Sequence, residues 1–141
     1  MTEHKSIIFL IDRCLECNSV IEAFRNAGIT IEVHKDHFPN DAQDVDWLPE
    51  VGRRGWVILT KDSKISKNPM ERNAVARAGI KMFTLNSANL SGEKMINIFL
   101  SAIVKIQYFA SSHPAPFIAK VTSQGKIEMV YSSQRLQKEL R

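Results

Sequence analysis

Hydrophobic positions along this chain follow two different periods, and segments with one period alternate with segments of the other. Short apolar runs bounded by glycine, proline or charged residues are typical of buried strands, and apolar positions three and four residues apart are typical of helices. The first run is Ser6–Ile11, and the segment Cys14–Asn26 follows it with helical spacing until Ala27-Gly28. This alternation predicts an α/β fold with a mostly parallel central sheet.

The same pattern continues to the end of the chain. It predicts further strands over residues 29–34, 55–60 and 80–85, and a closing hairpin formed by residues 117–123 and 126–131. It predicts one helix with Asp46 as N-cap and Pro49 in its first turn, a second with Asn68 as cap, and a long third from Ser91 to about Ser111. At 141 residues we expect one domain (1–141), with its core at about residues 6–111 and the hairpin and a charged tail at 117–141.

The long helix carries an apolar stripe and contains the longest hydrophobic run of the chain. The stripe is Met95, Ile98, Phe99, Ala102, Ile103 and Ile106, and we interpret it as a face buried in the core. The run Ile96–Leu100 is too short and too interrupted to predict a membrane span. Only a short polar segment precedes the first strand, so we expect no signal peptide and a cytoplasmic protein. Two cysteines do not suggest a disulfide framework.

Aspartates follow two of the predicted strands, and this is the feature that bears most on function. Asp12 ends the first strand, and Asp62 ends the strand Gly55–Thr60 after one lysine. Asp44 and Asp46 lie between them, at the start of a helix. In an open parallel sheet, residues just past the carboxyl ends of strands meet in one crevice, which is where such folds bind ligands. Carboxylates gathered there repel one another unless a cation joins them.

Oxygen ligands of this kind suit Mg²⁺ or Mn²⁺. We therefore predict a metal site built from Asp12, Asp44 and Asp62, with Asp46 as an alternate or neighbouring ligand. Simpler roles remain open: Asp12 as a helix N-cap, and Asp62 as a turn residue. If Asp46 caps its helix, Asp44 lies just upstream and is free to face the crevice.

Basic residues surround these acids in the sequence, and the formal net charge of the chain is +4. A polyanion has to be drawn toward carboxylates that repel it, and cations around the crevice would do this. For any single one of these cations, an ordinary solvated charge is the simpler interpretation. The candidates for binding phosphate groups are Arg13, Arg53, Arg54, Lys61, Lys64 and Lys67.

Three stretches of the chain carry a family resemblance: FLIDRC, HFPNDAQDVDWLPEVGRRGWVILTKDSKI and NPMERNAVARAGIKMFTL. Together they resemble the PIN-like superfamily of metal-dependent nucleases, and especially the VapC-like toxins of bacterial toxin–antitoxin pairs, over roughly Ile7 to Val121. The resemblance implies a three-layer α/β sandwich and an acid cluster that binds Mg²⁺ or Mn²⁺ and cleaves RNA. It also implies a cognate antitoxin protein and a homodimer as partners.

By position, the resemblance assigns the family's acids to Asp12, Asp44 (with Asp46 close by) and Asp62. Many members of the family have a fourth acid. The fourth predicted strand ends in Leu85-Asn86-Ser87, without a carboxylate. Glu71 fits this role if its helix points inward.

Phosphodiester hydrolysis is chemistry that such a site can perform, because a bound metal activates water and stabilises the charge on the leaving oxygen. One carboxylate would also accept the proton of the attacking water. We therefore interpret the chain as a metal-dependent endoribonuclease. Two alternatives stay open. One is a catalytically degenerate domain that binds nucleic acid or protein, and the other is a receiver-like phosphoacceptor, although Asp12 lacks the adjacent second acid which that class needs.

Other motifs are weaker. Cys14 and Cys17 have the spacing of a redox pair, but they follow the first strand, which is the wrong place for a thioredoxin-like fold. His34 and His37 lack a matching pair of ligands for zinc, so we interpret them as loop histidines. Trp47 and a second tryptophan, Trp56, are expected in the core; a role for Trp47 in base stacking has no independent support.

Overall fold

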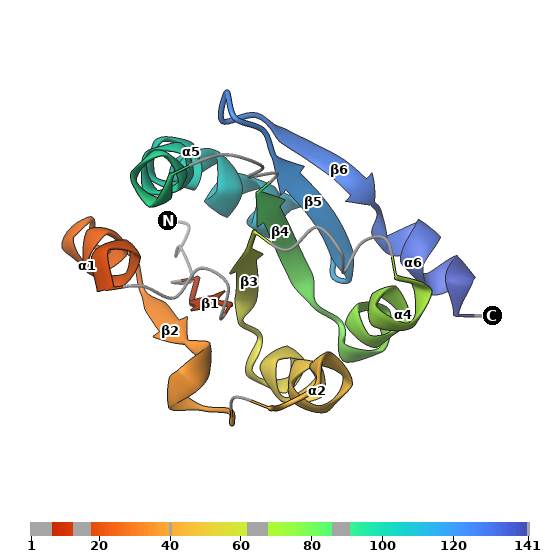
Figure 1. Cartoon of the computed structure of the whole chain (residues 1–141). Helices are drawn as coiled ribbons and strands as arrows, with labels where there is room; N and C mark the ends of the chain where they lie inside the picture. The colour runs from red at the N-terminus through yellow and green to blue at the C-terminus, as the bar shows by residue number, and fades with distance from the viewer. Residues whose placement is uncertain (1–6, 13–17, 40, 62–67, 86–90, 141) are drawn as a thin grey trace, which may run out of the picture.

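A single six-stranded sheet organises the chain in this computed structural model, which describes residues 7–12, 18–39, 41–61, 68–85 and 91–140. The strand order is β2-β1-β3-β4-β5-β6, in which the first five strands are parallel and β6 is antiparallel to β5 (Figure 1). The predicted mostly parallel sheet with a C-terminal hairpin is confirmed. The strands are β1 (Phe9–Ile11), β2 (Ile31–Val33), β3 (Val57–Thr60), β4 (Lys81–Leu85), β5 (Phe117–Val121) and β6 (Ile127–Tyr131).

Helices cover both faces of the sheet and complete a three-layer sandwich. One face is covered by α1 (Asn18–Asn26) and α5 (Gly92–Ser112). The other is covered by α2 (Asp44–Arg54), α4 (Pro69–Ala78) and the short C-terminal α6 (Ser133–Glu139), and Figure 1 shows the two groups on opposite sides of the strands. A 3-10 turn, η2 (His34–Asp36), follows β2.

Four strands, β1, β3, β4 and β5, contribute buried side chains to two hydrophobic cores, because successive side chains of a strand point to opposite faces. In β1, Phe9 and Ile11 pack under α1 and α5, whereas Leu10 packs under α2 and α4. All three of these side chains are fully buried. Burial on both faces explains why the strands appear in the sequence as continuous apolar runs rather than as an alternation of apolar and polar residues.

The helix ends that carry strong local signals lie where the sequence predicts them. The side chain of Asn68 accepts a hydrogen bond from the N–H of Met70 at 2.9 Å, and that of Ser91 accepts one from the N–H of Lys94 at 3.2 Å. The predicted stripe of α5 is buried at Met95, Phe99, Ala102, Ile103 and Ile106. By length and composition alone α5 would also be able to cross a membrane, contrary to our expectation, but a core helix passes the same test.

The start of α2 differs from the prediction. Gln43, and not Asp46, is the N-cap, and the N–H groups of Asp46 and Trp47 both donate to its carbonyl oxygen, at 2.9 and 3.3 Å. Asp44 is therefore the first residue of the helix, and Pro49 lies inside the helix rather than in its first turn. No side chain caps this helix, so the sequence carries no capping signal at its true start.

His34 is a core residue, and its interpretation as a loop histidine is wrong. Its side chain is fully buried, and its ring centroid lies 5.0 Å from that of Phe38 and 4.7 Å from that of Trp47. Trp47 is only 1% exposed, which confirms its place in the core and rules out stacking on a base. Trp56 is half-buried at the edge of the same core.

Candidate metal site at the carboxyl edge of the sheet

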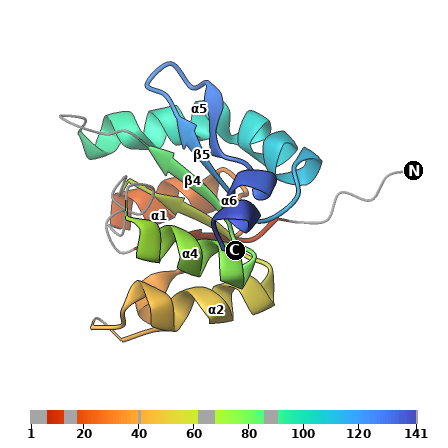
Figure 2. The same ribbon diagram turned by 90° about the vertical axis from the view of Figure 1, so that its right-hand side faces the viewer.

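The carboxyl ends of β1 to β5 lie along one edge of the sheet, because these strands are parallel. The chain passes from β1 to β2 on one side and then returns to β3 on the other side of β1. The boundary between β1 and β3 is therefore the point where the strand order reverses, which is where open α/β sheets bind ligands. In Figure 2, α2 and α4 both begin at this edge.

Asp12 lies at this boundary and is held there by β3. Its N–H donates to the carbonyl oxygen of Leu59 at 3.1 Å, which continues the ladder one residue beyond β1. The hydroxyl of Thr60 donates to Oδ2 of Asp12 at 2.9 Å. Asp12 is 8% exposed and Thr60 is fully buried. The carboxylate is thus fixed in orientation at the rim of the core.

Thr60 is a site residue that the sequence analysis did not single out. It ends the strand that precedes Lys61-Asp62, and in the sequence it reads as one more β-branched strand residue. The available signal was a hydroxyl at the end of an otherwise apolar run. Only the pairing of Ile11 with Leu59 places its hydroxyl next to Asp12.

A row of polar residues crosses the sheet at this level. The register places Thr84 opposite Thr60 and Lys120 opposite Thr84, so the row is Asp12, Thr60, Thr84 and Lys120. Thr84 is 4% exposed, and Nζ of Lys120 lies 3.2 Å from the carboxylate of Glu128. The row lies at the carboxyl end of the apolar core beneath α2 and α4, at the edge of the sheet where these two helices start.

The first turns of α2 and α4 bring further acids to this edge. Asp44 is the first residue of α2, and Asp46 is exposed in the same turn. Glu71 is half-buried in the first turn of α4. The positive end of a helix dipole stabilises carboxylates at both of these positions. The structure therefore brings the backbone of Asp44 and the side chains of Asp46 and Glu71 to the edge that holds Asp12, and the side chain of Asp44 lies outside the described part.

Several predicted residues fall outside the residues that the structure describes: Asp62, Arg13, Lys64, Lys67, Cys14 and Cys17. Lys61 is described and exposed directly after β3, at the same edge as Asp12.

Arg53 and Arg54 do not lie at this edge, so the structure does not bring them together with Asp12 as the sequence analysis predicts. They end α2, and β3 starts at Val57, so they lie near the amino ends of the strands. Both donate hydrogen bonds to the carboxylate of Glu50, and the guanidinium of Arg54 lies 4.9 Å from the ring centroid of Trp56. These hydrogen bonds hold the pKa of Glu50 below its ordinary value of 4.5.

A lysine at the same amino edge is also engaged with the protein. Nζ of Lys81 donates to the carbonyl oxygen of Ala110 in the last turns of α5, where a cation interacts well with the helix dipole. Partial burial lowers the pKa of Lys81, because desolvation disfavours the charged form. At this edge Arg53 and Arg54 are thus paired with Glu50, and Lys81 is hydrogen-bonded to the backbone.

Hard oxygen donors at the carboxyl edge fit a Mg²⁺ or Mn²⁺ ion. Asp12 supplies one carboxylate whose orientation is fixed, and Asp46 and Glu71 lie on helices that begin at the same edge. Within the described ranges, no three histidine, cysteine, aspartate or glutamate residues form a group that could hold a metal. The side chains of Asp44 and Asp62, which the sequence analysis predicts as ligands, lie outside the described part of the chain.

Comparison with known proteins agrees with this arrangement. A family model described as "PIN like domain" matches residues 7–87, which include Asp12, Thr60 and the first turns of α2 and α4. The chain is 28% identical over 115 residues to a protein of Mycobacterium tuberculosis (strain ATCC 25618 / H37Rv) named "Putative ribonuclease VapC45", and the alignment covers 79% of this chain and 83% of that protein. No solved structure matches the chain.

Proposed function

The chain belongs to the PIN-like domain family, and on that premise we propose that it is a metal-dependent endoribonuclease that hydrolyses RNA phosphodiester bonds. The observation that carries the proposal is the position of Asp12. It lies at the point where the strand order reverses, inside the matched region, with its carboxylate held by Thr60. The name of the mycobacterial relative supports the same activity.

In this proposal Asp12, Asp44 and Asp62 hold one or two Mg²⁺ or Mn²⁺ ions. The bound metal supplies a nucleophilic water and stabilises the charge on the leaving oxygen. Thr60 keeps Asp12 in the orientation that metal binding needs. We assign to Asp46, which is exposed in the first turn of α2, the role of accepting the proton of the attacking water, and to Glu71 the role of fourth acid.

RNA would approach over the carboxyl edge. Lys61 is the described cation there, and we assign Arg13 and Lys64 to the same role because they lie next to Asp12 and Asp62 in the sequence. Such residues hold backbone phosphates without reading the base sequence. The chain would act in the cytoplasm as the toxin of a toxin–antitoxin pair, and its partner would be a cognate antitoxin protein. We propose that the toxin itself is a homodimer. The similarity of its sequence to the VapC-like branch supports this role.

The test is cleavage of a mixed pool of structured and single-stranded RNA by wild type, Asp12→Asn and Asp36→Asn. Asp36 is an exposed aspartate of η2 and serves as the control. Each protein is assayed with Mg²⁺, with Mn²⁺ and with EDTA, and Mn²⁺ binding is measured by calorimetry. We expect cleavage that requires metal and falls by roughly 10²-fold or more in Asp12→Asn. We expect no change in Asp36→Asn.

A wild type that neither cleaves RNA nor binds Mn²⁺ would contradict the proposal. The remaining function would then be that of a non-catalytic binding domain. If Asp12→Asn still cleaves RNA, the active site does not include Asp12 and must lie elsewhere than at the carboxyl edge.

A further inference from the structure

A groove of about 620 Å³ lies between the C-terminal half of α5 and the turn of the β5–β6 hairpin. Its apolar lining includes Val104, Tyr108, Phe109 and Ile127, and its basic lining includes Lys105 and Lys126. We call this site the α5–hairpin groove. It lies outside the family match at residues 7–87 and on the face of the sheet opposite to the polar row of Asp12.

Two of its apolar side chains are unusually exposed for their size. Val104 is 73% exposed and Tyr108 is 76% exposed, and they are one helical turn apart on α5. The opposite face of the same helix is buried in the core, so these two side chains are apolar residues on the solvent side of α5. Phe109 and Ile127 pack against the core and form the floor of the groove. Clustered exposed apolar side chains of this kind mark interaction sites.

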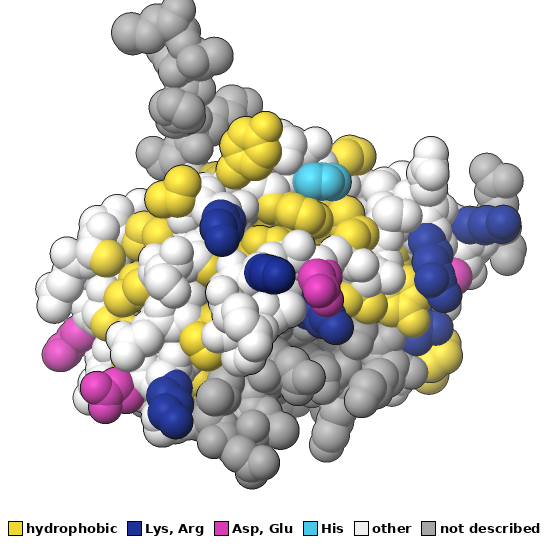
Figure 3. Space-filling view, turned by 90° about the horizontal axis from the view of Figure 1, so that it is seen from above, with side chains coloured by type: hydrophobic (Ala, Val, Ile, Leu, Met, Phe, Trp, Pro, Cys, Tyr) yellow, Lys and Arg dark blue, Asp and Glu magenta, His cyan; other side chains and the backbone are white. Residues whose placement is uncertain are grey.

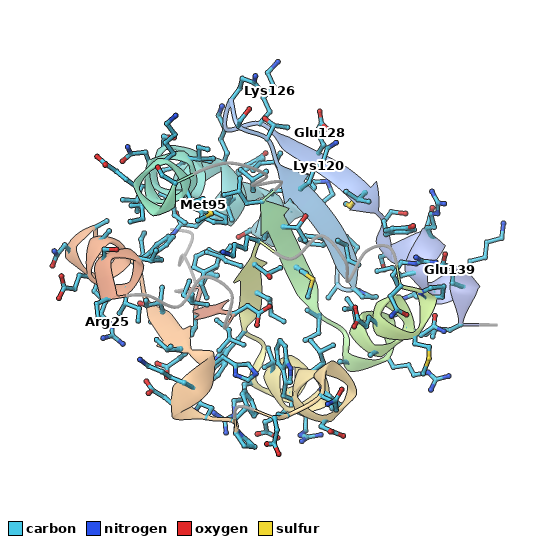
Figure 4. The ribbon with its side chains drawn as sticks, viewed as in Figure 1. Arg25, Met95, Lys120, Lys126, Glu128 and Glu139 are labelled. Atoms are coloured by element: carbon cyan, nitrogen blue, oxygen red, sulfur yellow. The ribbon has the colours of Figure 1, made fainter. Side chains whose placement is uncertain are left out.

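The charge around the groove has one sign. The charged residues that line it are Lys105 and Lys126, and none of its lining residues is acidic. Figure 3 shows hydrophobic side chains gathered on this face beside a histidine, with lysine or arginine side chains and one acidic side chain near them. Figure 4 shows Lys126 at the tip of the hairpin, and Glu128 beside Lys120, with which it forms an ion pair at 3.2 Å.

These features favour one kind of occupant over two others. A second copy of the chain docked face to face would bring the same lysines of both copies together, because such an interface uses the same patch twice. A bilayer surface is flat, and amphipathic helices that bind it lay an apolar face into the lipid. Here the apolar surface is hollowed between α5 and the hairpin, so it fits an inserted segment better than a flat membrane.

We propose that the α5–hairpin groove docks an amphipathic helix of another protein. Its apolar side chains, spaced three and four residues apart, would pack on Tyr108 and Val104, as in other grooves that bind helices. Acidic residues beside this stripe would pair with Lys105 and Lys126 and would give the contact its electrostatic complementarity. The contact is independent of the proposed ribonuclease activity, because the groove lies on the opposite face of the sheet from Asp12 and includes none of the proposed site residues.

The test selects binders from a phage-displayed library of random peptides about 16 residues long. The full chain is immobilised as wild type, Tyr108→Ser, Lys126→Glu and Met70→Ser. Met70 is a control for an exposed apolar residue, because it is 74% exposed on α4, away from the groove. We expect the peptides enriched on wild type to be acidic, with apolar residues at helical spacing, and we expect no such enrichment on Tyr108→Ser.

A synthetic copy of an enriched peptide is then titrated by fluorescence anisotropy. We expect its Kd to rise by about tenfold or more in Tyr108→Ser and in Lys126→Glu, and to stay unchanged in Met70→Ser. The effect of Lys126→Glu should shrink as salt is added. RNA cleavage, if present, should be the same in all four proteins.

Three results would overturn the proposal. The first is enrichment of neutral or basic peptides, or of none. The second is a dimer, detected by light scattering, that Tyr108→Ser dissociates. The third is sedimentation with phosphatidylserine vesicles that Tyr108→Ser abolishes, which would make the groove a membrane contact.

Discussion

At the scale of single residues, the candidate site depends on a hydrogen bond between two strand ends. Asp12 and Thr60 are 48 residues apart in the chain and meet at 2.9 Å. The hydroxyl donates to one carboxylate oxygen of Asp12, and this hydrogen bond fixes the orientation of the whole carboxylate group. In our proposal Thr60 is a positioning residue, because it acts on the metal through Asp12.

Replacing Thr60 by valine keeps the shape of the side chain and removes the donor. We expect Thr60→Val to weaken Mn²⁺ binding, measured by calorimetry, and to lower RNA cleavage by about tenfold. It should also cost about 1 kcal/mol of stability, because Asp12 loses its buried partner. Thr60→Ser keeps the donor and should restore metal binding. If serine and valine are equally impaired, the hydroxyl does not position Asp12.

Glu50 gives a pH dependence whose sign can be worked out. The hydrogen bonds from Arg53 and Arg54 lower its pKa in the folded state below the ordinary 4.5. The folded state therefore binds this proton less readily than the unfolded state, so the stabilisation is fully present above about pH 4.5. It is lost as the pH falls through the lower pKa of the folded state.

We therefore expect Glu50→Gln to lower the free energy of unfolding at pH 7 by an amount that shrinks as the pH falls below 4.5. Urea unfolding across pH 3–7 would measure this difference. Glu22→Gln, at an exposed position of α1, is the control. A deficit in Glu50→Gln that is the same at every pH would show that the ion pairs with Arg53 and Arg54 contribute nothing.

At the scale of the elements, α2 and α4, whose first turns carry Asp44 and Glu71, approach each other closely at their C-terminal ends. A methyl group at Gly52 would lie 1.9 Å from the carbonyl oxygen of Ala78, the last residue of α4. No side chain larger than hydrogen fits there unless the helices move apart. Gly52 is therefore needed for packing, although glycine inside a helix is unfavourable by itself.

Gly52→Ala tests this packing directly. The contact is with backbone, which cannot swing away, so we expect a loss of about 1–3 kcal/mol in the free energy of unfolding despite the better helix propensity of alanine. Gly92→Ala is the matched control, because a methyl group there meets nothing within 4 Å. Its change should stay within about 0.5 kcal/mol in thermal or urea unfolding. Equal effects at the two positions would contradict the close packing of α2 and α4.

At the scale of the whole molecule, the C-terminal hairpin completes both cores although it lies outside the family match. β5 pairs with β4 over residues 117–121, with Phe117 and Ala119 in one core and Ile118 in the other. The tail returns to α4, because Arg72 forms an ion pair with Glu139 at 3.2 Å. We therefore expect the fold to unfold as one cooperative unit rather than as a domain of residues 7–87 with an extension.

We expect a chain that ends at Ser112 to be unfolded by circular dichroism and by the dispersion of its NMR spectrum. Its β4 would lose its neighbour and would become an exposed edge strand. A chain that ends at Tyr131 keeps the sheet and loses only α6 with the fully buried Leu136. It should fold with a stability lower by about 2–5 kcal/mol. A cooperatively folded chain of residues 1–112 would show that the hairpin is dispensable.

Local patterns in the sequence determined the order of strands and helices, the mostly parallel sheet and the helix ends with their own capping residues, Asn68 and Ser91. These succeed because the physical cause lies within a few neighbouring residues. The prediction of the start of α2 was wrong for the same reason, because the side chain of Gln43 makes no capping hydrogen bond that the sequence could indicate.

The sequence also predicted Asp12 as a site residue, because residues just past the carboxyl ends of parallel strands meet in one crevice. Only the tertiary structure decided its surroundings. The register of β1 against β3 placed the hydroxyl of Thr60 beside it, and the direction of α2 carried Arg53 and Arg54 to the far edge. The burial of His34 between Phe38 and Trp47 likewise arises from packing. These outcomes depend on contacts between residues distant in the chain, and such contacts leave no local pattern.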